Sequence, residues 1–183
     1  MAKQSEQILE EQLIAQLQKL GYAHIVIPSE KELLANLQRQ LEKHNSASLT
    51  KTGNALFTQT EFEKVLNILN KGSVFEKGKI LRQKQHIVRD ASSSSAGENL
   101  YFEFLNTEHW CQNQYQITNQ VSQEGKYKNR YDVTILINGL PLVQIELKRR
   151  GLELKEAFNQ VNRYQRHSFG ANTALFQFVQ ILL

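Results

Sequence analysis

The chain has 183 residues, enough for one domain with a sizeable core, and 40% hydrophobic with 22% charged residues is a globular composition. It contains no apolar run of about 18 residues, which argues against a membrane-spanning helix, and because no apolar segment stands at its start we expect no secretory signal. Cys111 is the single cysteine, so an internal disulfide and a cysteine-based zinc site are excluded and a cytoplasmic setting is indicated. The net charge of +4 permits a polyanionic partner but does not require one.

The first part of the chain is predicted to be mainly helical. Residues 4–20 carry leucine and isoleucine at spacings of three and four, which predicts an amphipathic helix. Residues 23–27 form a short β-type run, and Ser29 with Glu32 then makes the capping box of a second helix. Residues 60–69 have the apolar spacing of a third helix.

The composition indicates one domain over residues 1–183, interrupted by a flexible loop. Residues 91–98 are rich in serine and low in complexity, which is typical of such a loop. Residues 175–183 form an apolar run, predicted to be a buried strand, and the chain stops there without a polar tail. We therefore expect the chain to be a fragment of a longer protein.

The region from 116 to 167 has the clearest pattern. Residues 116–121 and 131–137 are predicted strands, and Asn138-Gly139 is a strong hairpin signal. The returning strand is predicted over residues 140–148, and residues 154–167 then form a helix.

Two carboxylates and a lysine on this hairpin suggest phosphodiester hydrolysis. Pairing across the turn puts Asp132 opposite position 145, so Glu146 is one residue away, within the error of a β-bulge. Glu146 and Lys148 are two residues apart and therefore share a strand face. We expect the two carboxylates to bind Mg²⁺ and Lys148 to orient water or stabilise the phosphate.

The pattern alone leaves a plainer interpretation open, because Glu-x-Lys is common on exposed strands. A nucleic-acid partner is favoured by basic residues on both sides of the carboxylates: Lys126, Lys128, Arg130, Arg149 and Arg150. These residues could equally form a solvated basic surface.

Three further residues are candidates for the same site. Gln160 and Tyr164 are four apart on the predicted helix and share a face, although Tyr164 could simply be a core residue. Glu10 interrupts the apolar face of the first helix, where a carboxylate needs a partner. The alternative for Glu10 is an exposed acid favoured by the helix dipole.

Residues 129–148, followed by residues 156–164, resemble the N-terminal nuclease domain of the type I restriction enzyme R (HsdR) subunit, of the PD-(D/E)xK superfamily. The resemblance rests on the Asp…Glu-x-Lys core, the Asn-Gly-Leu-Pro-Leu hairpin and the Gln-x-x-x-Tyr helix, in that order. It implies an α/β fold with a mixed central β-sheet flanked by helices.

The resemblance also implies roles for the candidate residues. Asp132 and Glu146 would bind Mg²⁺, Lys148 would be the catalytic lysine, and Gln160 and Tyr164 would match the family's Gln-x-x-x-Tyr motif. The resemblance supports a role for Glu10 less specifically than it does for the other residues.

By the same resemblance, the complete subunit would be a type I site-specific deoxyribonuclease. It would cleave double-stranded DNA after translocation driven by ATP in helicase domains absent from this chain. It would work with methylation (HsdM) and specificity (HsdS) subunits. Two alternatives stay open: another nuclease of the superfamily, acting in DNA repair or on junctions, and a catalytically silent DNA-binding module.

Overall fold

The computed structural model describes residues 5–90, 95–123, 129–148, 159 and 175–183. The chain divides into two compact units, one containing residues 1–34 and 115–183, the other residues 35–114. The second unit is thus inserted in the sequence of the first. Within the described residues, none of the helices is long and apolar enough to cross a bilayer.

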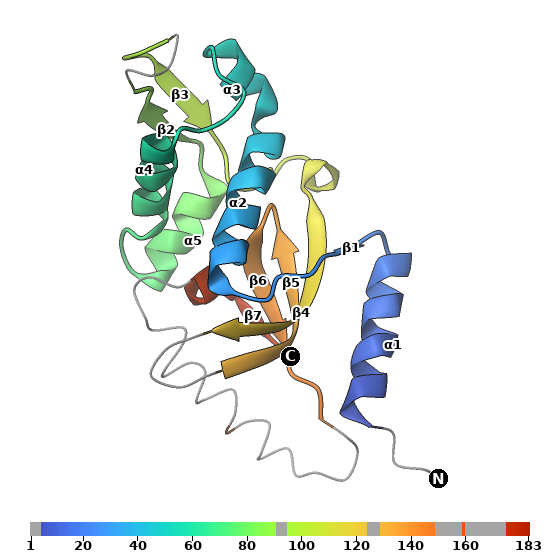
Figure 1. Ribbon diagram of the computed structural model, residues 1–183. Helices are drawn as coiled ribbons and strands as arrows, with labels where there is room; N and C mark the ends of the chain where they lie inside the picture. Colours follow the sequence, from blue (N-terminus) through green and yellow to red (C-terminus); the bar gives the residue numbers. More distant parts are fainter. Residues whose placement is uncertain (1–4, 91–94, 124–128, 149–158, 160–174) are drawn as a thin grey trace. The chain divides into compact units, whose positions relative to one another are not determined.

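The first unit contains a five-stranded mixed sheet in the order β1-β4-β5-β6-β7 (Figure 1). The two outer pairs, β1 with β4 and β6 with β7, are parallel, and the two inner pairs are antiparallel. The strands are β1 (Ala23–His24), β4 (Tyr115–Gln123), β5 (Asn129–Ile137), β6 (Leu140–Ile145) and β7 (Ile181–Leu182). This confirms the predicted mixed sheet.

Helix α1 (Glu6–Lys19) packs against this sheet, close to the predicted bounds. The Ser5 side chain accepts a hydrogen bond from the Ile8 N–H and caps the helix, and Gly21 follows it with φ +94°. Ile14 is buried with Ile117 of β4 and Val133 of β5. The apolar stripe that predicted the helix therefore fixes it on the sheet.

The β5–β6 hairpin turns at Asn138 and Gly139, whose φ angles of 49° and 82° are those of a type I′ turn. A β-bulge between Ile135 and Leu136 shifts the register by one residue, so that Val133 pairs with Ile145. Continued by one step, this register sets Asp132 opposite Glu146.

Two predicted strands end differently in the structure. Strand β6 stops at Ile145 instead of residue 148, because the Leu147 N–H donates to the Asp132 carboxylate instead of to a neighbouring backbone. The run predicted over 23–27 is a strand only at its first two residues.

The predicted strand 175–183 begins instead as a 3-10 turn, η2 (Leu175–Phe178), and only Ile181–Leu182 is strand. Four consecutive buried side chains in η2 suit a turn, since a strand would expose alternate ones. Phe176 of η2 packs on Tyr131 of β5, with ring centroids 4.1 Å apart. Of the helix predicted over 154–167, only Asn159 is described, and it is helical.

The second unit is built from helices and a small hairpin. Helix α2 (Glu30–His44) begins in the first unit, next to the expected contact between the Ser29 hydroxyl and the Glu32 carboxylate. The other elements are α3 (Ser46–Lys51), α4 (Gln59–Leu69), α5 (Val74–Arg82), β2 (Gln85–Val88), β3 (Asn99–Phe102) and η1 (Trp110–Gln112). The helix predicted over 60–69 is α4. Of the predicted loop 91–98, residues 91–94 lie outside the described residues.

Candidate active site

Asp132 lies on β5 beside the end of the hairpin partner strand. Its carboxylate accepts a hydrogen bond of 2.8 Å from the Leu147 N–H. Partial burial raises the pKa of Asp132, and the negative charges of Glu10 and Glu6 raise it further. The Leu147 hydrogen bond and the charge of Lys148 act in the opposite direction.

Glu146 follows the last residue of β6 and is only 9% exposed. Its N–H donates to the Leu183 carbonyl at 3.0 Å, and the next N–H along the chain, that of Leu147, donates to Asp132. These two hydrogen bonds hold the backbone on both sides of the Glu146 side chain. The Gln144 side-chain amide donates to Glu146 Oε1 at 3.3 Å, while Gln144 Oε1 accepts a 2.7 Å bond from the Thr134 hydroxyl. Thr134 therefore orients the amide that faces Glu146.

Burial, together with the negative charge of Asp132, raises the pKa of Glu146 to about 8. The charge of Lys148 opposes this shift. Burial combined with a neighbouring like charge is the arrangement by which functional sites raise the pKa of a carboxyl group.

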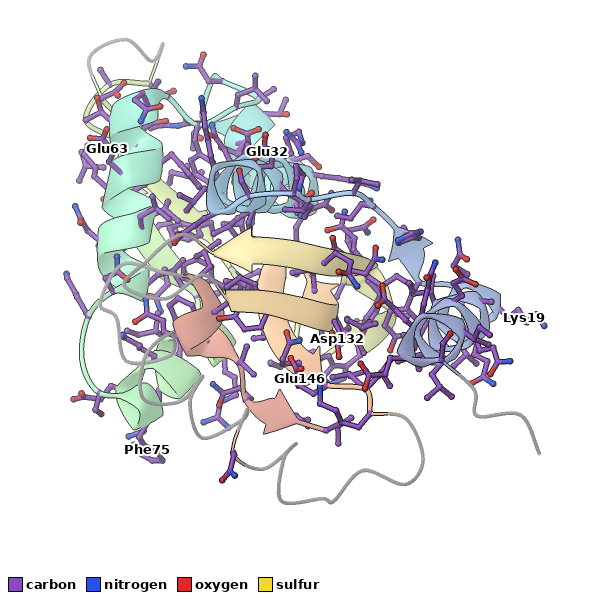
Figure 2. All side chains as sticks on the ribbon, turned by 60° about the horizontal axis from the view of Figure 1, so that its bottom comes forward. Lys19, Glu32, Glu63, Phe75, Asp132 and Glu146 are labelled. Atoms are coloured by element: carbon purple, nitrogen blue, oxygen red, sulfur yellow. The ribbon has the colours of Figure 1, made fainter. Side chains whose placement is uncertain are left out.

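The structure thus brings Asp132, Glu146 and Lys148 together at one end of the hairpin, where Figure 2 labels the two acids. Ile145 and Leu147, between the polar residues, pack on the cluster around Ile14, as strand alternation predicts. The roles of the three polar residues remain a prediction.

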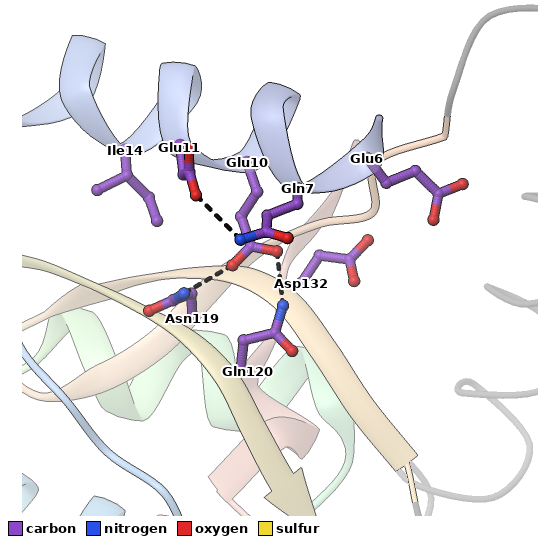
Figure 3. Close-up of a pocket in the computed structure, with 8 residues that line it drawn as sticks. All are labelled: Glu6, Gln7, Glu10, Glu11, Ile14, Asn119, Gln120 and Asp132. Atoms are coloured by element: carbon purple, nitrogen blue, oxygen red, sulfur yellow. Dashed lines mark hydrogen bonds between the residues drawn. The ribbon is translucent and has the colours of Figure 1, made fainter. Parts of the chain in front are cut away.

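Glu10 of α1 joins this group across a cavity of about 510 Å³ that is also lined by Asp132 (Figure 3). Glu10 is 8% exposed, which excludes the interpretation as a solvated acid near the helix start. Its two carboxylate oxygens accept 2.6 Å hydrogen bonds from the side-chain amides of Asn119 and Gln120.

Asn119 and Gln120 of β4 are residues that the sequence did not single out. Gln120 has φ +58°, a left-handed conformation that nothing in a run of strand-forming residues indicates. Gln160 and Tyr164 lie outside the described residues, so their position beside the carboxylates stays a prediction.

The chemistry of the site suits a hard divalent cation. Asp132 and Glu146 supply the oxygen ligands that Mg²⁺ takes, and both carboxylates have raised pKa values that a cation would lower. Among the described residues, no group of three or more histidine, cysteine or acidic side chains is arranged to hold a metal ion.

A mixed sheet with a carboxylate pair and a lysine on its central hairpin is compatible with the core of PD-(D/E)xK nucleases. The family model of the type I restriction enzyme R protein N terminus (HSDR_N) matches residues 3–183. The chain belongs to this family.

Curated relatives carry the same kind of name. The type I restriction enzyme SauCOLORF180P endonuclease subunit of Staphylococcus aureus (strain COL) is 46% identical over 183 residues, all of this chain and 18% of that protein. The EcoprrI endonuclease subunit of Escherichia coli is 35% identical over 181 residues, 98% of this chain and 55% of that protein. The chain therefore spans less than a fifth of the staphylococcal relative and about half of the Escherichia coli one.

Proposed function

We propose that this chain is the magnesium-dependent endonuclease domain of a type I restriction enzyme R subunit, cleaving double-stranded DNA. The observation that carries the proposal is the end of the bulged hairpin, where Val133 pairs with Ile145 and the charges of Asp132 and Lys148 both act on the neighbouring Glu146 carboxyl. The family of the chain gives this geometry its context.

Asp132 and Glu146 would hold the Mg²⁺, and Glu10, Gln160 and Tyr164 would complete the site. The ion, when bound, lowers the pKa of a water molecule and neutralises charge on the phosphate. Lys148 would donate to a non-bridging phosphate oxygen or to the attacking water, and its positive charge would stabilise the negative charge of the transition state.

The chain's own hydrogen bonds support this division of roles. The Leu147 N–H occupies one oxygen of Asp132, and the Gln144 amide contacts one oxygen of Glu146, so each carboxylate is held in one orientation. Carboxylates held this way lose less conformational freedom when they bind an ion or substrate.

The proposal assigns DNA translocation and recognition of the target sequence to domains and subunits outside this chain. ATP-driven translocation would belong to helicase domains elsewhere in the subunit, and the target sequence would be set by the specificity subunit, with the methylation subunit completing the complex. We expect the complex to act in the cytoplasm, where the DNA is.

The test is plasmid cleavage by the complete enzyme with Mg²⁺ and ATP. Asp132→Ala and Lys148→Ala should each reduce cleavage by about a hundredfold or more, since each removes a group that acts on the reacting phosphate. Glu63→Gln, an exposed carboxylate on α4, serves as the control and should cleave as wild type. Undiminished cleavage by both site variants would refute the assignment, and DNA binding without cleavage by the wild type would favour a silent module.

A further inference from the structure

The carboxylate of Glu10 accepts hydrogen bonds from two neighbouring residues of strand β4. Asn119 Nδ2 donates to Oε1 and Gln120 Nε2 donates to Oε2, both at 2.6 Å (Figure 3). Each oxygen thus has its own donor, and hydrogen bonds to a charged group are among the stronger ones. We refer to Asn119 and Gln120 as the amide clamp.

A regular strand could not form this clamp. Consecutive side chains of a strand point to opposite faces of the sheet, so Asn119 and Gln120 should not reach one carboxylate. The φ of +58° at Gln120 breaks the alternation and brings both amides to the side of α1.

The break in β4 is confined to one position. Asn119 pairs with Val133 and Val121 pairs with Tyr131, so the register is the same on both sides of Gln120. The residue that this register sets opposite Gln120 is Asp132. The irregular backbone therefore coincides with the predicted site.

The left-handed backbone conformation of Gln120 is unfavourable for a glutamine. Left-handed backbone is unfavourable for residues other than glycine and, to a lesser degree, asparagine. Gln120 Oε1 is buried and, among the described residues, has no hydrogen-bond partner. Unfavourable backbone that persists is most often found at functional sites.

Asn119 is itself oriented from the other side. The His24 Nε2 atom lies 3.1 Å from Asn119 Oδ1, within hydrogen-bonding distance. With Oδ1 directed to His24, the Nδ2 donor faces Glu10. The clamp is therefore connected to β1 as well as to α1.

We propose that Asn119 and Gln120 are positioning residues that hold the Glu10 carboxylate at the Asp132 side of the site. The inference rests on the proposed nuclease function, because it assigns the clamp a purpose in that site. Under this proposal, the left-handed backbone at Gln120 lowers the stability of the folded chain, and the same conformation lets the Gln120 side chain orient Glu10.

Gln120→Gly separates the two effects. Glycine adopts positive φ freely, so the backbone strain is relieved while the amide donor is lost. We expect a melting temperature within about 3 °C of wild type, since the two changes oppose one another. Plasmid cleavage by the complete enzyme should fall roughly tenfold, because Glu10 keeps only the Asn119 donor and its second oxygen is no longer held.

Conservative and control variants complete the test. Gln120→Asn keeps an amide and tolerates left-handed backbone, so it should recover part of the cleavage that glycine loses. Gln18→Ala removes an exposed amide near the other end of α1, away from the cavity, and should cleave as wild type. In NMR spectra of the wild-type chain, the Gln120 side-chain amide protons should exchange slowly, and Glu10→Gln should accelerate their exchange.

Asp132→Asn, measured in parallel, separates failure of the inference from failure of the proposed function. If Asp132→Asn abolishes cleavage and Gln120→Gly does not reduce it, the clamp has no positioning role. A large fall in melting temperature that accounts for the lost cleavage of Gln120→Gly would likewise overturn the inference. If Asp132→Asn cleaves as wild type, the nuclease proposal fails, and rapid amide exchange at Gln120 would then refute the clamp as well.

Discussion

At the scale of the residue, the informative feature is an acid whose environment opposes its charge. Glu146 is almost fully buried, lies near Asp132 and has a pKa raised to about 8. Without a cation, the folded chain therefore favours the protonated carboxyl near neutral pH. Binding of Mg²⁺ would require that proton to leave, so metal affinity should increase with pH.

This pKa predicts how the stability of the metal-free chain depends on pH. Because the folded pKa lies above the ordinary value of 4.5, the folded state binds more protons than the unfolded state between about pH 5 and 8. The free energy of unfolding should fall over this interval, by up to about 3 kcal/mol after solvent screening is allowed for. Urea unfolding in EDTA at pH 5, 6.5 and 8 measures it.

Glu146→Gln is the matched variant for that experiment. It keeps the shape of the side chain but removes the titrating group, so its stability should change much less between pH 5 and 8. Stability that rises with pH in the wild type, or an equal fall in both proteins, would contradict the shifted pKa.

At the scale of the element, the features that local sequence determines were predicted better than the features that long-range contacts determine. Helix α1 and the β5–β6 hairpin follow from apolar spacing and from Asn138-Gly139, whose effect is local. The bulge at Ile135 and Leu136 could be suspected only because Glu146 was one residue out of register with Asp132. The amide clamp could not be predicted, because it depends on one left-handed residue and on Glu10, more than 100 residues away.

The second unit contains a buried ion pair that local patterns also missed. Arg89 donates to Glu61 at 2.8 Å, with both side chains fully buried. The same guanidinium donates to the backbone carbonyls of Leu49 and Asn54, and the Asp90 N–H donates to Glu61. The pair thus connects α4 to the ends of α3 and β2.

Removing one partner of this pair should destabilise the chain strongly. Arg89→Met leaves the Glu61 carboxylate buried without its cation, which typically costs about 3–5 kcal/mol. Arg89→Met combined with Glu61→Gln should recover part of the loss, because no unpaired charge remains. Chemical unfolding measures both, with the exposed Arg82→Met as control; a loss below about 1 kcal/mol in Arg89→Met would show that solvent relieves the charge.

At the scale of the whole molecule, the candidate site belongs to one of the two units. Its described residues come from α1, β4, β5 and the end of β6, although the second unit is inserted between β1 and β4 in the sequence. Sequence patterns predicted four of the site residues, namely Asp132, Glu146, Lys148 and Glu10. The fold of the first unit brings all four to the same region. Gln160 and Tyr164 remain predictions, since the described residues do not include them.

The central claim is that Asp132 and Glu146 form a magnesium site, and calorimetric titration of the chain with Mg²⁺ at pH 8 tests it most directly. Wild type and the Glu63→Gln control should bind with equal affinity, while Asp132→Asn and Glu146→Gln should each weaken binding by about tenfold or more, since each removes a charged ligand. Equal Mg²⁺ affinity in wild type and in both site variants would contradict the account.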